Sequence, residues 1–145
     1  MPQPLCDALR DKIHEQIDRT EHLIGLMPAE SPQDALVAHL LDCVSGFCAA
    51  LYGARPDRLQ HFLALRGHPA TLPVYRAHID EAFALLTDAD LASKIPTVFV
   101  PAGETLLTLL LGNLEHLINH KHELFTVLKR SGVPVATPDL YRLRS

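Results

Sequence analysis

Apolar residues recur every three or four positions over four long stretches of the chain, which is the pattern of helices that bury one face. In the first stretch Leu9, Ile13 and Ile17 fall on one stripe, and charged residues occupy the opposite face. Proline and glycine are sparse within these stretches and gather between them, where a helix is expected to end. The predicted long helices cover residues 5–27, 32–53, 72–92 and 102–130.

The connecting segments predict one further helix and two extended stretches. Residues 54–73 are irregular, with a short helix expected over 58–66. The apolar, proline-containing segment 94–101 is expected to be an extended linker, and the proline-rich tail 133–138 a non-helical strap. No other strand, repeat or second domain is expected. The sequence therefore predicts a single all-α domain over residues 1–145, built as a four-helix bundle.

Composition narrows the classes of protein that fit. With 145 residues, 48% of them hydrophobic, the chain can bury a core of its own. The net charge is -4 and the basic residues are scattered, which argues against a nucleic-acid partner, because duplex binding needs a basic face. The longest apolar run, residues 106–114, is shorter than the roughly 18 residues of a membrane span, and residues 1–12 lack an apolar signal core. We therefore expect a cytoplasmic protein without a membrane partner, and the odd number of cysteines excludes a disulfide scaffold.

Three of the nine histidines are candidate ligands for a metal ion. His116 and His120 are four residues apart, about 40° on a helical wheel, so two imidazoles project side by side at the border between the polar and apolar faces. His39 shares an inward arc of the second helix with Leu36 and Cys43, and it is the best third ligand. A buried neutral histidine with one hydrogen bond, and an incidental pair of exposed rings, remain the alternatives.

The remaining side chains near these histidines have less specific roles. Cys43 could add a thiolate, but a free cysteine usually packs as a small core residue. Asp42 and Glu123 are expected either to orient an imidazole from behind or to be solvated carboxylates. The solvent-exposed His14 and His22, and His122, which points away from His116, are not expected to join the site.

The chemistry expected of such a site is that of an open metal centre. Phosphate-binding glycine loops, G-x-S-x-G, CxxC and H-E-x-x-H motifs are missing, so no catalytic residue is assigned. Three neutral imidazoles suit Zn, Ni or Fe(II) and leave coordination positions free for a water molecule or a thiol. Apolar residues on the same arcs are expected to form the wall of a small-molecule pocket: Leu36, Cys43, Phe47, Leu109 and Leu117.

Four short segments resemble the DinB/YfiT-like superfamily. They are the histidine segment 36–41, the segment 101–104 that leads into the last helix, the ligand segment 116–120, and the exit 132–135. The resemblance implies a four-helix bundle of up-down-down-up connectivity, often dimeric, with a divalent metal held by His39, His116 and His120. Members include thiol-dependent S-transferases and a thiol-dependent maleylpyruvate isomerase. Where many members follow the last ligand with Arg-Gly-Gln, this chain has residues 121–123 as Lys-His-Glu, which permits a degenerate site.

Two functions from different classes follow. The first is a metal-dependent enzyme, such as a thiol-dependent S-transferase or a hydrolase, that acts on a small electrophile. The alternative is a non-catalytic ligand-binding or dimerisation module. A homodimer is favoured by the last predicted helix, which is apolar over more than half of its circumference. The residues that suggest this are Leu107, Leu111, Leu114, Ile118 and Phe125.

Overall fold

The computed structural model describes residues 2–28, 34–54, 72–97 and 100–141. Within these ranges the fold is mostly helical, as predicted, and four of the helices are long. The long helices are α1 (Pro4–Gly25), α2 (Asp34–Ala54), α3 (Leu72–Leu85) and α4 (Leu106–Arg130). The short elements are a 3₁₀ helix (Asp88–Ala92), the strands β1 (Lys94–Ile95) and β2 (Glu104–Thr105), and α5 (Thr137–Leu140). The helix expected over 58–66 lies outside the described residues.

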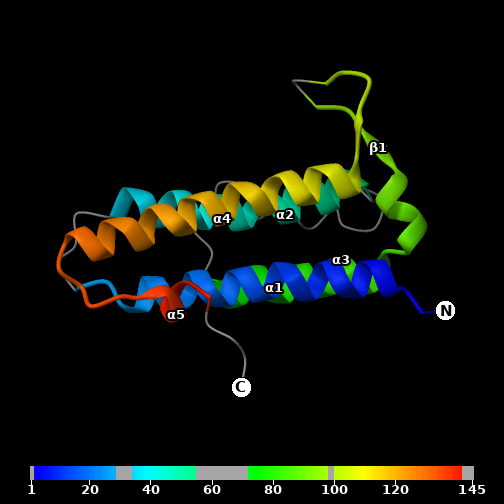
Figure 1. The fold of residues 1–145 in the computed structure, drawn as a ribbon. Coiled ribbons are helices and arrows are strands. Elements are labelled where there is room, and N and C mark those ends of the chain that lie inside the picture. The colour runs from blue at the N-terminus through cyan, green and yellow to red at the C-terminus, as the bar shows by residue number, and fades with distance from the viewer. Residues whose placement is uncertain (1, 29–33, 55–71, 98–99, 142–145) are drawn as a thin grey trace.

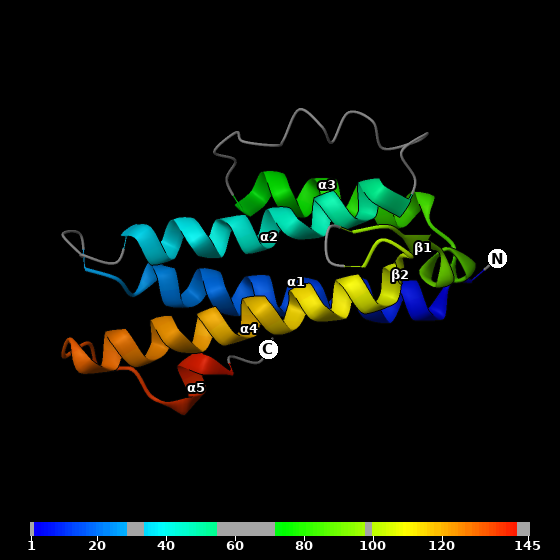
Figure 2. The same ribbon diagram turned by 90° about the horizontal axis from the view of Figure 1, so that it is seen from above.

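The four long helices pack in two layers. Figure 1 shows α2 beside α4 in one layer and α1 beside α3 in the other. Contacts across the layers join α2 to α3 and α1 to α4. Figure 2, turned by 90°, shows α5 beside α4 on the side away from α2. Helix α4 therefore has α2 on one side and α1 with α5 on the other.

A continuous apolar core holds the layers together. Phe47 of α2, Ile17 of α1 and Leu117 of α4 are all completely buried. Burial of such a side chain contributes about 1.5–3 kcal/mol relative to leaving it in water. The expectation that Leu114 and Phe125 add to an exposed apolar surface is wrong, because both lie in the core. Leu107 and Leu111 are the exposed leucines of α4, at 38% and 49%.

Helix α4 begins later than predicted because the preceding residues form a short sheet. Lys94 pairs with Thr105 and Ile95 with Glu104 in an antiparallel register. One strand thus lies in the expected linker, and the other replaces the expected start of the last helix. Gly103 has a φ of 94°, a conformation that glycine adopts without steric cost and that cannot be part of a helix. Thr105 then caps α4, its side chain accepting a hydrogen bond from the backbone N–H of Thr108 at 3.1 Å.

Two other helix boundaries differ from the prediction. α3 ends at Leu85, and a separate 3₁₀ turn follows, whose Asp88 carboxylate accepts hydrogen bonds from the backbone N–H groups of Leu5 and Cys6. This contact caps the start of α1 from a distant part of the chain, while Leu5 itself is exposed, not buried. The tail was predicted to be non-helical, yet Thr137–Leu140 forms α5, since Pro138 is tolerated in the first turn of a helix.

One segment of α2 is more apolar than the sequence analysis recognised. Among the described residues, Ala35–Gly53 is long and apolar enough to cross a membrane by length and composition alone. The core helix of a soluble protein has the same properties. In this fold the segment contributes Leu40, Val44, Phe47 and Leu51 to the core.

Candidate metal centre

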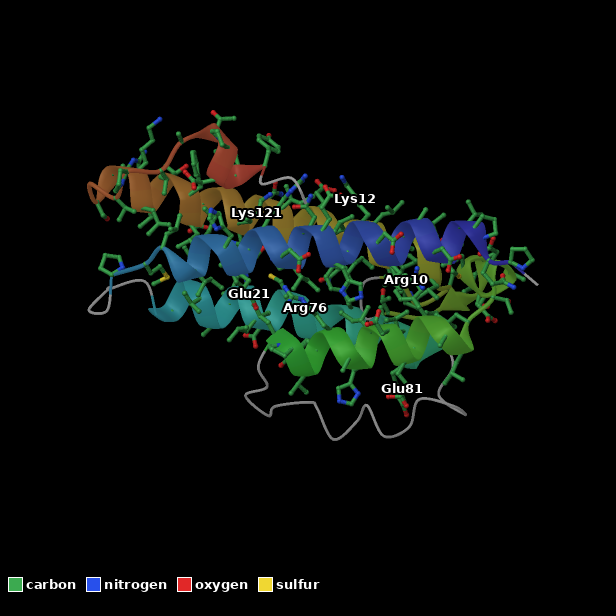
Figure 3. The ribbon with its side chains drawn as sticks, turned by 90° about the horizontal axis from the view of Figure 1, so that it is seen from below. Arg10, Lys12, Glu21, Arg76, Glu81 and Lys121 are labelled. Atoms are coloured by element: carbon green, nitrogen blue, oxygen red, sulfur yellow. The ribbon has the colours of Figure 1, made fainter. Side chains whose placement is uncertain are left out.

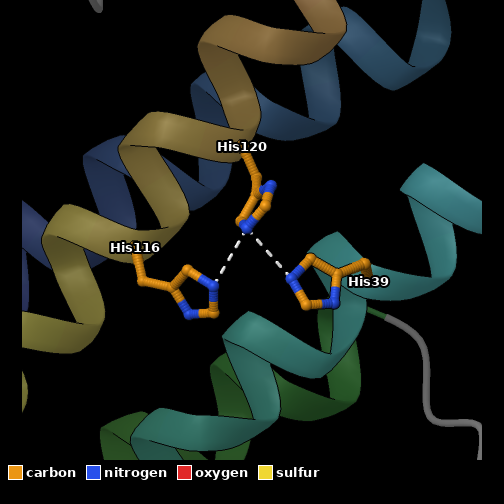
Figure 4. A group of neighbouring side chains, drawn as sticks. All are labelled: His39, His116 and His120. Atoms are coloured by element: carbon orange, nitrogen blue, oxygen red, sulfur yellow. Dashed lines mark hydrogen bonds between the residues drawn. The ribbon is translucent and has the colours of Figure 1, made fainter.

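The register of α4 brings His116 and His120 to the face that borders α2. Buried leucines, among them Leu110, Leu117 and Leu124, fix the rotation of this helix against the core. His116 and His120 stand one turn apart at the edge of this apolar row. From α2, His39 precedes the buried Leu40 and reaches toward the same edge. Figure 4 shows the three rings meeting between the two helices.

The Nε2 atoms of the three imidazoles converge on one point. Nε2 of His120 lies 3.0 Å from Nε2 of His39 and 2.9 Å from Nε2 of His116. All three candidate ligand atoms lie within 4.8 Å of one another. The ring planes are steeply inclined, at 83° between His39 and His120 and 66° between His116 and His120, so the rings meet by their edges. This group could hold a metal ion.

A close approach of the two helices sets this geometry. Gly46 of α2 faces Asn113 of α4 with no room between them for a methyl group, because a Cβ on Gly46 would lie 2.7 Å from Oδ1 of Asn113. The Nδ2 of Asn113 donates a hydrogen bond of 2.8 Å to the backbone carbonyl of Cys43. Asn113 precedes His116 by about one turn, and Cys43 follows His39 by about one turn. The contact therefore pins α2 and α4 beside the histidines.

Glu123 determines which nitrogen of His120 carries the proton. Its Oε2 lies 2.9 Å from Nδ1 of His120. A carboxylate only accepts hydrogen bonds, so Nδ1 is the donor and Nε2 of the neutral ring keeps its lone pair. That lone pair faces His39 and His116. A carboxylate behind a histidine in this way is typical of metal sites, where it fixes the tautomer and orientation of the ligand.

Cys43 lies behind His116. Its Sγ is 3.7 Å from Nδ1 of His116, so Nε2 of that ring points away from the sulfur and toward His120. Burial, and secondarily the negative charge of Asp42, raises the pKa of the Cys43 thiol. A neutral thiol fits the expectation of a small core residue better than that of a thiolate ligand. Partial burial and the imidazoles of His120 and His39 lower the pKa of His116, which favours the neutral ring that a metal requires.

Several histidines differ in exposure from what the sequence predicted. His39 was expected to face inward, but it is exposed. His116 and His120 were expected at the border between the polar and apolar faces, and they are exposed and half-buried, respectively. The reason is that the three rings meet at the outer edge of the α2–α4 contact. His14 and His22 were expected to be exposed, yet their side chains are only 13% and 19% exposed, and they contact Asp80 and Asp139.

The two carboxylates expected to orient a histidine lie in different environments, and so do the residues expected to form the pocket wall. Glu123 contacts His120, whereas Asp42 is exposed and makes no contact with the three rings among the described residues. Phe47 and Leu117 are core residues with no exposed surface, Leu36 is half-buried, and Leu109 lines a groove.

The groove runs from the end of the sheet to His116, between α2 and α4. Its volume is about 850 Å³, within the range of small-molecule sites. Small residues of the two helices make room for it. Lining residues include Gly46, Ala50, Gly53, Leu109, Gly112 and His116. The sequence predicted a pocket walled by larger apolar residues, of which Leu109 does line the groove. The small lining residues were missed, although glycines inside two helices otherwise built from larger residues were their signal.

Protein-family models, curated proteins and solved structures were compared with this chain, and none of them matches it. The interpretation of the site therefore depends on the geometry of its own residues.

Proposed function

We propose that this chain binds one divalent metal ion through the Nε2 atoms of His39, His116 and His120. The observation that carries the proposal is the position of His120 Nε2, 2.9 Å from one neighbouring Nε2 and 3.0 Å from the other. Two nitrogens that bind one ion at about 2.0–2.1 Å lie about 2.9 Å apart at a right angle and about 3.4 Å apart in a tetrahedron. The two separations from His120 therefore fit an ion with shifts of a few tenths of an ångström, and all three ligand atoms lie within 4.8 Å of one another.

The donor set indicates which ions suit the site. Imidazole nitrogen is a ligand of intermediate softness that suits zinc, nickel and iron(II) and is poorly matched to calcium or magnesium. Glu123 supports the proposal because it holds His120 in the tautomer that binds through Nε2. Exposure of His39 and His116 leaves the site accessible from solvent.

The reaction class that we propose is attack of a low-molecular-weight thiol on a small electrophile, as the resemblance to the DinB/YfiT-like superfamily implies. A divalent ion with three neutral protein ligands supplies Lewis acidity and lowers the pKa of a thiol or water at its open positions. The groove would hold the apolar part of the electrophile against Leu109 and Ala50, and His116 stands at its end. Membership of that superfamily, with up-down-down-up connectivity of the four helices, is part of the same proposal. Its support is the order of the three histidines along α2 and α4.

Metal analysis tests the proposal directly. Protein purified without a polyhistidine tag is expected to contain close to one equivalent of divalent metal. The variants His39→Gln, His116→Gln and His120→Gln should lose most of it while the helical circular dichroism signal is kept. His122→Gln is the matched control, because His122 is exposed on the same helix but makes no contact with the three rings. Full metal occupancy in all three ligand variants would show that the assignment is wrong.

Turnover separates an enzyme from a binding module. Loss of free thiol is measured with a panel of electrophiles, for the metal-loaded protein and for His116→Gln. Metal-dependent consumption supports the transferase. Stoichiometric metal without turnover supports the ligand-binding or dimerisation module instead.

A further inference from the structure

A second cavity lies on the side of α4 that faces α1, away from the histidine cluster. Its volume is about 450 Å³, and α1, α4 and α5 with the residue that follows it contribute its walls. The apolar part of the lining comes from Ile118, Leu140 and Tyr141, and the charged part from Lys12, Arg19 and Lys121. Lys12 and Lys121 appear on the same side of α1 in Figure 3, away from Arg76 and Glu21. The cavity is thus a concave site with an apolar wall and three cations.

Lys121 is the unusual residue of this cavity, because its side chain is charged yet only 2% exposed. Its Nζ donates to Oε1 of Gln16 at 2.9 Å and to the backbone carbonyl of Leu140 at 3.3 Å. Both acceptors are neutral, and the third N–H of the ammonium has no acceptor among the described residues. A buried ammonium normally has a carboxylate partner, since leaving water without one is costly. Among the described residues, the ammonium of Lys121 therefore has no hydrogen-bonded carboxylate, and one of its N–H groups can still donate to an anion.

The lysine and arginine side chains that line the cavity have no lining carboxylate opposite them among the described residues. Arg19 is 7% exposed and pairs with Glu15 at 2.6 Å, and Lys12 pairs with the same carboxylate at 3.0 Å. Glu15 thus contacts two of the cations, and Lys121 adds a third positive charge to the lining of the cavity. No acidic residue is among the described residues that line the cavity. The local field favours an anion inside it.

The ring of Tyr141 gives the site an aromatic wall. Nζ of Lys121 lies 5.7 Å from the ring centroid, and Cζ of Arg19 lies 5.9 Å from it. These are cation–π distances, so the ring lies over both cations. Tyr141 is 55% exposed, so this wall of the cavity borders solvent.

We propose that this cavity binds a small carboxylic acid with an apolar body, such as a short-chain fatty acid or an aromatic acid. The carboxylate would accept the third N–H of Lys121, and the body would pack on Ile118, Leu140 and Tyr141. A single carboxylate suits the one N–H of Lys121 that has no acceptor among the described residues, whereas a phosphate dianion needs several donors. A volume of about 450 Å³ suits a ligand of this size. The proposal does not depend on the metal site.

Calorimetric titration of the full chain with hexanoate, benzoate and hexan-1-ol tests the proposal. Carboxylate and phosphate buffers are avoided, and bound metal is removed beforehand by a chelator and dialysis. At least one of the two acids is expected to bind at least tenfold more tightly than the alcohol, and with one equivalent per chain. Inorganic phosphate is expected to bind at least tenfold more weakly than that acid. Equal affinity for hexanoate, benzoate and the alcohol would overturn the proposal.

Variants locate the binding. Lys121→Met keeps the length of the buried stem and should weaken acid binding at least tenfold, whereas Lys129→Met, at an exposed lysine of the same helix, should leave it unchanged. Ile118→Phe fills part of the cavity without altering its charge and should also weaken binding, which keeps the test valid if Lys121→Met does not fold. His116→Gln should bind the acid as the unmodified chain does. Undiminished binding by folded Lys121→Met or by Ile118→Phe, or loss of binding in His116→Gln, would overturn the assignment.

Discussion

Replacing Gly46 by alanine would test how closely α2 and α4 approach beside the histidine cluster. The added Cβ would lie 2.7 Å from Oδ1, 3.1 Å from Nδ2 and 3.2 Å from Cγ of Asn113. Contacts as short as the first are not tolerated, so either Asn113 or the helix must move. Asn113 cannot turn aside freely, because its Nδ2 is bonded to the carbonyl of Cys43 at 2.8 Å.

The expected change in the free energy of unfolding is the balance of opposing effects. Alanine in place of glycine inside a helix stabilises by about 0.8–1 kcal/mol. Loss of the Asn113 hydrogen bond costs about 0.5–1.5 kcal/mol, and forcing extra volume into a packed contact costs about 1–3 kcal/mol. The balance is a destabilisation by Gly46→Ala of about 1–3 kcal/mol. Separation of α2 from α4 should also weaken metal binding, since the ligands come from both helices.

Gly112→Ala is the matched control for this substitution. A Cβ on Gly112 of α4 meets nothing within 4 Å, so only the helix preference acts, and stabilisation by about 0.8–1 kcal/mol is expected. Urea denaturation followed by circular dichroism gives both free energies of unfolding. In the double variant Gly46→Ala/Asn113→Ala the clash is removed, and the two changes should cost less together than the sum of the single changes. If Gly46→Ala stabilised as much as Gly112→Ala, the close approach described for α2 and α4 would be refuted.

Four further outcomes are expected. Zinc at a free concentration 100 times its dissociation constant should raise the free energy of unfolding by about 2.7 kcal/mol, and a thermal melt of His39→Gln should show no such gain. Glu123→Ala should weaken zinc affinity about 10–100-fold in a competition titration with a chelating dye; unchanged affinity would mean that Glu123 does not orient His120. Burial raises the pKa of the Cys48 thiol to about 12, above its unfolded value. The neutral thiol therefore makes its full contribution to the free energy of unfolding below pH 9, and this contribution falls as pH rises toward 12. Relative to Cys48→Ala, the unmodified chain should lose about 2 kcal/mol between pH 8 and pH 10.5 in urea titrations, and a pH-independent difference would contradict this cause. If the exposed leucines of α4 mediate the homodimer expected from the sequence, light scattering should give a dimer mass for the unmodified chain and a monomer mass for Leu111→Glu.

The helices were predictable because their buried faces follow the helical period closely. Leu9, Ile13 and Ile17 in α1 form the kind of stripe that periodicity detects, and all three are buried. Helical periodicity also puts position 121 on the inward row of α4, between Leu117 and Leu124. No prediction was made for the lysine at this position, and the structure buries it. Its charge hides what the helical period indicates.

The start of α4 and the exposure of His39 were harder to predict, because both depend on contacts between residues that are far apart in the sequence. The pairing of Lys94 with Thr105 sets the start of α4, and no local pattern indicates it. His116 and His120 could be paired from their spacing alone, since one helix carries both. The exposure of His39 could not be predicted, because it depends on how far α2 stands from α4, and Gly46 and Asn113 decide that distance.

His120 and Lys121 are consecutive residues of α4, but His120 lies on the side of the helix that faces α2, and Lys121 lies on the side that faces α1. Successive residues are rotated by about 100°, so a single inserted or deleted residue upstream within α4 would turn both flanks relative to the core at once. Among short changes, one of about seven residues, close to two full turns, nearly restores the orientation. Length variation in this part of the chain should consequently be confined to the connections outside α4, and divergence within the helix should proceed by substitution alone.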